Sequence, residues 1–190
     1  TSYPLPGAFY LLAAAFELFG PSILVSRWLV AIEYALFVAL VFVVVRRLLP
    51  PGWAWAAVGL LLLYRVWAFP HWQMYNYSTT AMLLLTASWA ALVQFLCSEK
   101  RGWLAFSGLL FGLGVFCKQD YGAATLLAAT ATLIVYTRTR PAATRAAFWP
   151  LFAAFLWPGA VVGALAGLHF WWQGQRGPVS QLTVRNHFGG

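Results

Sequence analysis

A polar hexapeptide, Cys117-Lys-Gln-Asp-Tyr-Gly122, separates two apolar stretches and gathers several reactive side chains. Lys118 offers a cation, Asp120 an anion, and Gln119 an amide between them. A helix that begins here would present free N–H groups, which together with a cation suit a phosphate. A tight turn, with Asp120 as helix cap and Lys118 extending to the membrane surface, explains the same residues. Both interpretations stay open at this point.

Three charged residues fall inside apolar stretches long enough to span a membrane, where a charge is costly and indicates function unless the side chain reaches the surface. They are Arg27, Glu33 and Arg65. Arg27 and Glu33 are separated by roughly 240° around a helix, so they do not face one another. Glu33 therefore needs a partner from another segment, and a structural role explains it as well as a catalytic one.

The segment Phe69-Pro-His-Trp-Gln-Met-Tyr-Asn-Tyr-Ser78 is rich in aromatic and hydrogen-bonding side chains. It fits an aromatic belt at the membrane surface, and it also fits the lining of a cavity for a sugar or a lipid headgroup. In the second interpretation His71 joins the candidate substrate-binding residues. The full candidate set is Arg27, Arg65, His71, Lys118, Gln119 and Asp120.

The sequence lacks the motifs of several other classes of enzyme. We find no Walker loop, nucleophile elbow, zinc motif or paired carboxylates. No ligand set for a metal and no cofactor is identified, although a divalent metal stays open. The chain has 12 Lys and Arg residues against 4 Asp and Glu, a net charge of +8. These cations form no clustered face, which argues against a nucleic-acid partner.

The elements that must position the candidate residues are apolar helices. Hydrophobic residues make up 62% of the 190 residues and charged residues only 8%, where about 25% charged is usual in a soluble domain. A water-soluble globule is therefore excluded. The composition predicts an all-α fold, a polytopic transmembrane helix bundle that forms one partial domain over residues 1–190.

Six spans are expected after a short interfacial helix at 8–19, which a truncated span explains about as well. The spans lie near residues 22–45, 53–69, 80–97, 103–117, 121–136 and 147–172. The fourth and fifth are short, about 22–24 Å by the helix rise against a hydrocarbon core of about 30 Å. The turn between them is expected to lie in a recessed, solvated site.

The orientation follows from the cations, because short cytoplasmic loops carry an excess of Lys and Arg. Alternate loops hold Arg46, Arg47, Lys100, Arg101, Arg138, Arg140 and Arg145. The hexapeptide then lies on the opposite, non-cytoplasmic side. We expect an integral multi-pass protein of a bacterial inner membrane, with its active site on the outer face.

Two small-xxx-small patterns predict close helix packing. They run from Gly108 to Gly112 and from Gly163 to Gly167. Glycines at this spacing let two helix backbones approach closely inside a bilayer.

Two stretches resemble the GT-C class of lipid-linked glycosyltransferases, in particular the bacterial group related to protein mannosyltransferases and lipid A sugar transferases. Residues 16–27, FELFGPSILVSR, resemble the "lfG.s....R" segment of that family. Residues 108–122, GLLFGLGVFCKQDYG, resemble its "Gll.Gl....KQ..G" hairpin. The resemblance covers most of residues 5–137.

The resemblance implies transfer of a sugar from a polyprenyl-phosphate carrier to an acceptor at the non-cytoplasmic face. Its partners would be that lipid-linked sugar and membrane lipid. Arg27 and Lys118 would lie near the lipid phosphate, with Gln119 and Asp120 lining the same cavity. The family's catalytic acid lies in the first outer loop, upstream of the region that matches Thr1, so this chain is expected to be a fragment without its general base.

Two other hypotheses compete with the transferase. A transporter or lipid flippase fragment would use the turn at 117–122 as a broken-helix substrate site. A purely structural membrane subunit is the third hypothesis.

Overall fold

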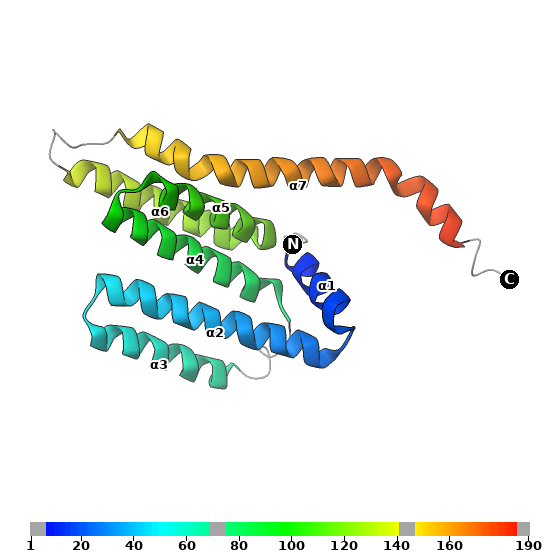
Figure 1. The fold of residues 1–190 in the computed structure, drawn as a ribbon, viewed down its shortest axis with the longest axis horizontal. Coiled ribbons are helices and arrows are strands. Elements are labelled where there is room, and N and C mark those ends of the chain that lie inside the picture. Colours follow the sequence, from blue (N-terminus) through cyan, green and yellow to red (C-terminus); the bar gives the residue numbers. More distant parts are fainter. Residues whose placement is uncertain (1–6, 69–74, 141–146, 186–190) are drawn as a thin grey trace.

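The computed structural model describes residues 7–68, 75–140 and 147–185, with side chains through residue 172. Its helices are α1 (Gly7–Phe19), α2 (Ile23–Leu48), α3 (Pro51–Trp67), α4 (Tyr77–Ser98), α5 (Arg101–Cys117), α6 (Gln119–Thr139) and α7 (Phe148–Arg185) (Figure 1). The described residues contain no strand, and the predicted all-α class is confirmed.

Three helices are long and apolar enough to cross a membrane, as judged by length and composition. They are Ile23–Leu48, Tyr77–Ser98 and the Phe148–Trp172 part of α7. Gly7–Phe19 and Arg101–Cys117 are apolar but shorter. The fold is therefore that of a helical membrane bundle, while the count of six spans stays a prediction.

Two helices begin directly after residues whose side chains satisfy free backbone N–H groups. Ser22 caps α2 by accepting a hydrogen bond from the Leu24 N–H at 3.1 Å. Asn76 caps α4 in the same way, accepting from the Ser78 N–H at 3.0 Å. Such caps offset the loss of partners in the first turn.

Helix α6 is longer than its expected apolar segment. The span expected at 121–136 lies inside α6, which has 21 residues and so extends about 32 Å. The helix continues through polar residues at both ends, because backbone hydrogen bonds form between polar residues as well as between apolar ones. Of the two helices that flank the turn at Lys118, α5, with 17 residues, is the one shorter than a hydrocarbon core of about 30 Å, so the recessed depth of this turn stays a prediction.

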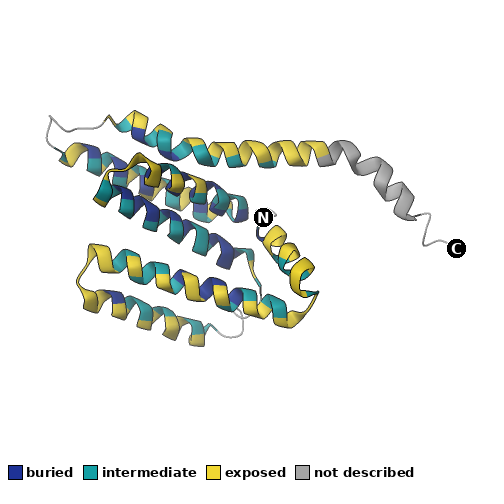
Figure 2. Cartoon of the chain, in the orientation of Figure 1, coloured by how far each residue is buried: buried dark blue, intermediate teal, exposed yellow. Residues whose placement is uncertain are grey.

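α4 occupies the centre of the bundle (Figure 1). The α2–α3 hairpin packs on one side of it through α2, and α5 packs on the other side, followed by α7. The main core contains Leu85, Leu92, Phe95, Leu104, Phe111, Ala129, Leu133, Leu151 and Phe155. Figure 2 shows buried residues concentrated in α4 and α5, whereas α3 and the 157–172 part of α7 are largely exposed. Most of their exposed side chains are apolar, as Trp67 illustrates at 81% exposure, which fits a surface that faces lipid.

The first small-xxx-small pattern is used for packing and the second is not. A Cβ on Gly108 would overlap with the backbone carbonyl of Phe155 in α7, and a Cβ on Gly112 would lie 2.5 Å from the Gly159 Cα. Gly163 and Gly167 have open space where a Cβ would lie. These two glycines instead line an apolar groove of about 480 Å³ between α5 and α7.

The two ends of the bundle differ in their polar contacts. The end that holds the start of α2, α4 and α6 also holds Lys118, and we call it the Lys118 end; the other is the Arg47 end (Figure 1). At the Arg47 end, Arg47 of α2 donates to Gln94 of α4. Arg140, which follows α6, forms an ion pair with Glu99 after α4. These contacts tie neighbouring helices together.

Candidate functional site

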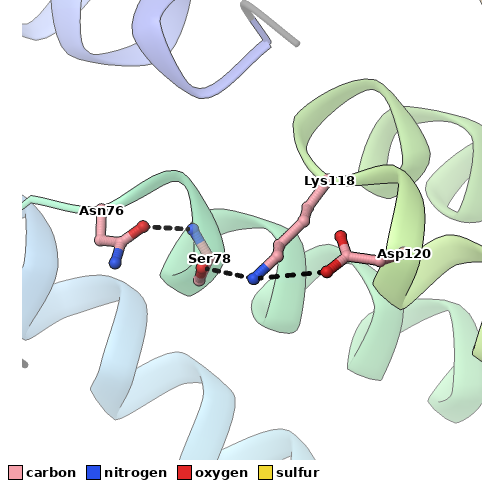
Figure 3. Close-up of polar contacts among 4 residues, drawn as sticks. All are labelled: Asn76, Ser78, Lys118 and Asp120. Carbon is pink, nitrogen blue, oxygen red and sulfur yellow. Dashed lines mark hydrogen bonds and ion pairs between the residues drawn. The ribbon is translucent and has the colours of Figure 1, made fainter. Parts of the chain in front are cut away.

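Lys118 occupies the turn between α5 and α6, and its ammonium group points toward the start of α4 (Figure 3). Its Nζ donates to the Ser78 Oγ at 3.1 Å and lies 3.8 Å from the Asp120 Oδ2. The Lys118 side chain is 18% exposed and that of Asp120 is 58% exposed. The cation is therefore largely enclosed, while its acidic partner faces outward.

Two aromatic rings complete the surroundings of the Lys118 ammonium. Its Nζ lies 3.9 Å from the ring centroid of Tyr121 and 5.4 Å from that of Tyr77. The negative faces of aromatic rings attract a cation at these distances. Lys118 thus stays near Ser78 instead of extending to the surface as the tight-turn interpretation expects.

Gln119 and Asp120 belong to the first turn of α6. Lys118 holds the N-cap position without a side-chain cap bond, so the expectation that Asp120 caps this helix is wrong. Asp120 instead lies beside the helix N-terminus, where its negative charge is favoured. Gln119 is the first residue of α6 and is exposed.

Glu33 finds the partner it needs at the start of α4. The Thr80 Oγ1 donates to its Oε1 at 2.6 Å, and the Thr79 Oγ1 donates to its Oε2 at 2.9 Å. Glu33 itself is 3% exposed. The two threonines directly follow Ser78, so one turn of α4 contacts both Glu33 and Lys118.

Arg27 and Arg65 line a common cleft. It has a volume of about 250 Å³ and is lined by Leu24, Arg27, Trp28, Val30, Ala31 and Arg65. The Arg65 guanidinium lies 4.2 Å from the ring centroid of Tyr34. Among the described residues neither arginine forms an ion pair with an acidic side chain. Two cations in one cleft favour an anionic ligand, because guanidinium groups bind phosphate well.

The sequence already indicated that Arg27 and Arg65 lie near each other. Arg27 lies near the start of one helix and Arg65 near the end of the next, and these two ends meet in an antiparallel hairpin. Ser78, Thr79 and Thr80 had a weaker signal, three consecutive hydroxyl residues at the start of an apolar helix. Their partners depend on packing between distant segments, which the sequence pattern does not give. His71 falls in residues 69–74, outside the described part of the chain.

Tyr75 connects α1 to this end of α4. Its hydroxyl donates to the Ala8 carbonyl oxygen at 2.5 Å and lies 3.2 Å from the Thr80 Oγ1. Burial raises the pKa of Tyr75 to about 12, because the enclosed site disfavours the phenolate. The phenol therefore stays protonated and keeps its hydrogen bond to Ala8 at physiological pH.

The described residues contain no group of three or more His, Cys, Asp or Glu side chains arranged to hold a metal ion. The polar chemistry of the Lys118 end is that of cations, hydroxyls and aromatic rings, together with the carboxyl groups of Glu33 and Asp120. Its cations and hydroxyls can bind and orient an anionic ligand.

Comparison with protein families gives a match over most of the chain. A family model described as dolichyl-phosphate-mannose-protein mannosyltransferase matches residues 2–166. Searches of the curated proteins and of the solved structures found no significant match. The family match agrees with the resemblance in residues 16–27 and 108–122 and with the helical membrane fold. The chain therefore belongs to the dolichyl-phosphate-mannose-protein mannosyltransferase family, a family of GT-C membrane glycosyltransferases.

Proposed function

We propose that this chain forms the donor-binding part of a membrane glycosyltransferase. The donor is a sugar on a polyprenyl-phosphate carrier, and transfer to the acceptor takes place at the non-cytoplasmic face. Family membership supports the donor class. The observation that carries the proposal is the cleft shared by Arg27 and Arg65, two cations that have no acidic partner among the described residues.

The proposed chemistry separates two tasks. A carboxylate takes the proton of the acceptor hydroxyl, whose oxygen then attacks the anomeric carbon of the sugar. The bond from that carbon to the phosphate oxygen breaks, and the polyprenyl phosphate leaves with additional negative charge. Arg27, Arg65 and Lys118 stabilise this charge, which lowers the barrier if they bind it more strongly in the transition state than in the ground state.

Lys118 takes part as a second cationic group. Its current partner Asp120 is exposed and lies 3.8 Å away, so a donor phosphate can replace it as the closer anion. Gln119, exposed in the same turn, is proposed to contact the sugar or the phosphate. His71 stays a candidate from the sequence.

The test uses the full-length protein in liposomes with polyprenyl-phosphate-mannose as donor. Arg27→Ala, Arg65→Ala and Lys118→Ala are each expected to lower transfer by about 10- to 100-fold, since a hydrogen bond to a charged group contributes about 1.5–3 kcal/mol. The loss should exceed any fall in protein level.

Arg46→Ala is the matched control, because it removes a cation at the Arg47 end of α2. It should leave transfer within about twofold of the wild type. Unchanged transfer in Arg27→Ala and Arg65→Ala would contradict the assignment of the cleft to the donor phosphate.

A further inference from the structure

We infer that Glu33 is a positioning residue, which fixes the first turn of α4 and thereby holds Ser78 against Lys118. The inference rests on the proposed function in one respect, namely that Lys118 contacts the donor phosphate. In the part of the chain that the structure describes, Glu33 bonds to Thr79 and Thr80, not to Lys118, and it does not line the cleft of Arg27 and Arg65.

The contact between Glu33 and α4 uses both carboxyl oxygens. Oε1 accepts from Thr80 at 2.6 Å and Oε2 accepts from Thr79 at 2.9 Å. Two bonds to two consecutive residues fix both the rotation of the turn and its height along α2. Because Glu33 is 3% exposed and Thr79 and Thr80 are 5% and 4% exposed, water cannot readily replace either bond.

The position of Glu33 at a helix N-terminus strengthens this contact. Asn76 caps α4, and Thr79 and Thr80 stand in its first turn. The N-terminus of a helix carries partial positive charge, so a carboxyl group beside it is favoured. An apolar residue at position 33 would remove this acceptor from both threonine hydroxyls, and they would keep only contacts within their own segment: Thr79 with the Asn76 carbonyl oxygen at 2.7 Å and Thr80 with the Tyr75 hydroxyl at 3.2 Å.

The same turn presents Ser78 to Lys118. Ser78 is 8% exposed, and its Oγ accepts from the Lys118 Nζ at 3.1 Å. A displacement of the turn by about 1 Å would lengthen this hydrogen bond beyond its effective range. Lys118 would then keep only Asp120 and the tyrosine rings, neither of which fixes its direction as a short hydrogen bond does.

The experiment measures the position of Lys118 directly. Lys118 and Lys100 are the two lysines of the sequence, so Lys100 serves as an internal reference in amine labelling. The full-length protein in liposomes is treated with an amine-reactive reagent, and the labelled peptides are quantified by mass spectrometry. Glu33→Ala is expected to raise the labelling rate of Lys118 relative to Lys100 severalfold.

Two further variants distinguish a positioning role of Glu33 from a general effect on the stability of the fold. Glu33→Gln retains one acceptor oxygen and nearly the same shape, so it should keep labelling close to the wild-type rate. Ser88→Ala removes a buried α4–α5 contact, in which Ser88 donates to the Ser107 carbonyl oxygen at 2.8 Å. Ser88 is about 15 Å along α4 from Ser78, so this variant should lower stability without changing the labelling of Lys118.

Kinetics then connect the position of Lys118 to the reaction. Glu33→Ala should raise the KM for polyprenyl-phosphate-mannose about tenfold and change kcat less. If Glu33 acts through Lys118, the double variant Glu33→Ala/Lys118→Ala should be no worse than Lys118→Ala alone, within about twofold.

The outcomes test the positioning role of Glu33 separately from the proposed contact of Lys118 with the donor phosphate. Unchanged labelling of Lys118 in Glu33→Ala, or equal changes in Glu33→Ala and Ser88→Ala, overturns the positioning role. Increased labelling together with a normal donor KM in Lys118→Ala supports the positioning role and contradicts the proposed function of Lys118.

Discussion

At the scale of single residues, Lys118 keeps its charge in a mostly enclosed place because several weak partners surround it. Ser78 supplies an oxygen, Asp120 an opposite charge, and Tyr121 a ring face. Each contact is individually modest, and Asp120 is too exposed to contribute much to stability. Such an arrangement holds a cation in place while leaving it available to a stronger anion.

Tyr75 gives a prediction about pH. Its pKa is raised to about 12 in the folded protein, above the ordinary value near 10. The stability that this group contributes is therefore fully present below about pH 10 and is lost as the pH rises through about 12. Tyr75→Phe should lower the free energy of unfolding by about 1 kcal/mol at pH 7. It should also remove the part of the stability loss at alkaline pH that comes from the ionisation of Tyr75.

Thermal unfolding of the purified protein at pH 7 and pH 11 measures both effects. Tyr10→Phe is a suitable control, because its hydroxyl bonds to the exposed His169 at 3.2 Å. It should change stability less at pH 7. An undiminished alkaline decline in Tyr75→Phe would show that the decline arises elsewhere.

The residue types of the site were largely predictable, but their partners were not. The charges of Arg27, Glu33 and Lys118 inside or against apolar segments already marked them as candidates. The partners of Glu33 depend on how α2 packs against α4. Thr79 and Thr80 follow Glu33 by 46 and 47 positions in the chain. Local patterns carry no information on such contacts, which is also why Ser78 was missed.

At the scale of elements, α5 and α7 approach closely at one pair of glycines and separate at another. Gly112→Ala should destabilise the bundle, because the added Cβ would lie 2.5 Å from the Gly159 Cα. Overpacking of this kind costs about 1–3 kcal/mol. Gly163→Ala is the matched control: it has space for a Cβ, and alanine favours a helix by about 1 kcal/mol.

The midpoint of thermal unfolding in detergent checks this difference. Gly112→Ala should unfold at a lower temperature than the wild type, and Gly163→Ala at an equal or higher one. A similar loss in both variants would mean that α7 packs along its whole length on α5.

The helices themselves were predictable because each depends on local sequence. Ser22 precedes α2 and Asn76 precedes α4, and both cap their helices as such residues usually do. The length of α6 was underestimated, because the prediction followed the apolar residues, whereas the helix also includes the polar residues Gln119 and Thr139 at its ends.

At the scale of the whole molecule, the distribution of cations predicts which end faces the cytoplasm. Gln119 lies at the Lys118 end and Cys97 near the Arg47 end, and both are exposed. In a Cys117→Ser background, Gln119→Cys should react with a membrane-impermeant thiol reagent added to intact cells. Cys97 should react only after the cells are permeabilised. The reverse pattern would invert the proposed topology and move the donor site to the cytoplasmic side.

The α2–α3 hairpin has a mechanical consequence for the site. It joins the rest of the bundle through α2, which packs on α1 and α4, and it carries the Arg27–Arg65 cleft, whereas Lys118 belongs to the α5–α6 turn. The cationic groups thus belong to two different helix hairpins, so the packing of α2 on α4 and of α4 on α5 sets the spacing between the Arg27–Arg65 cleft and Lys118.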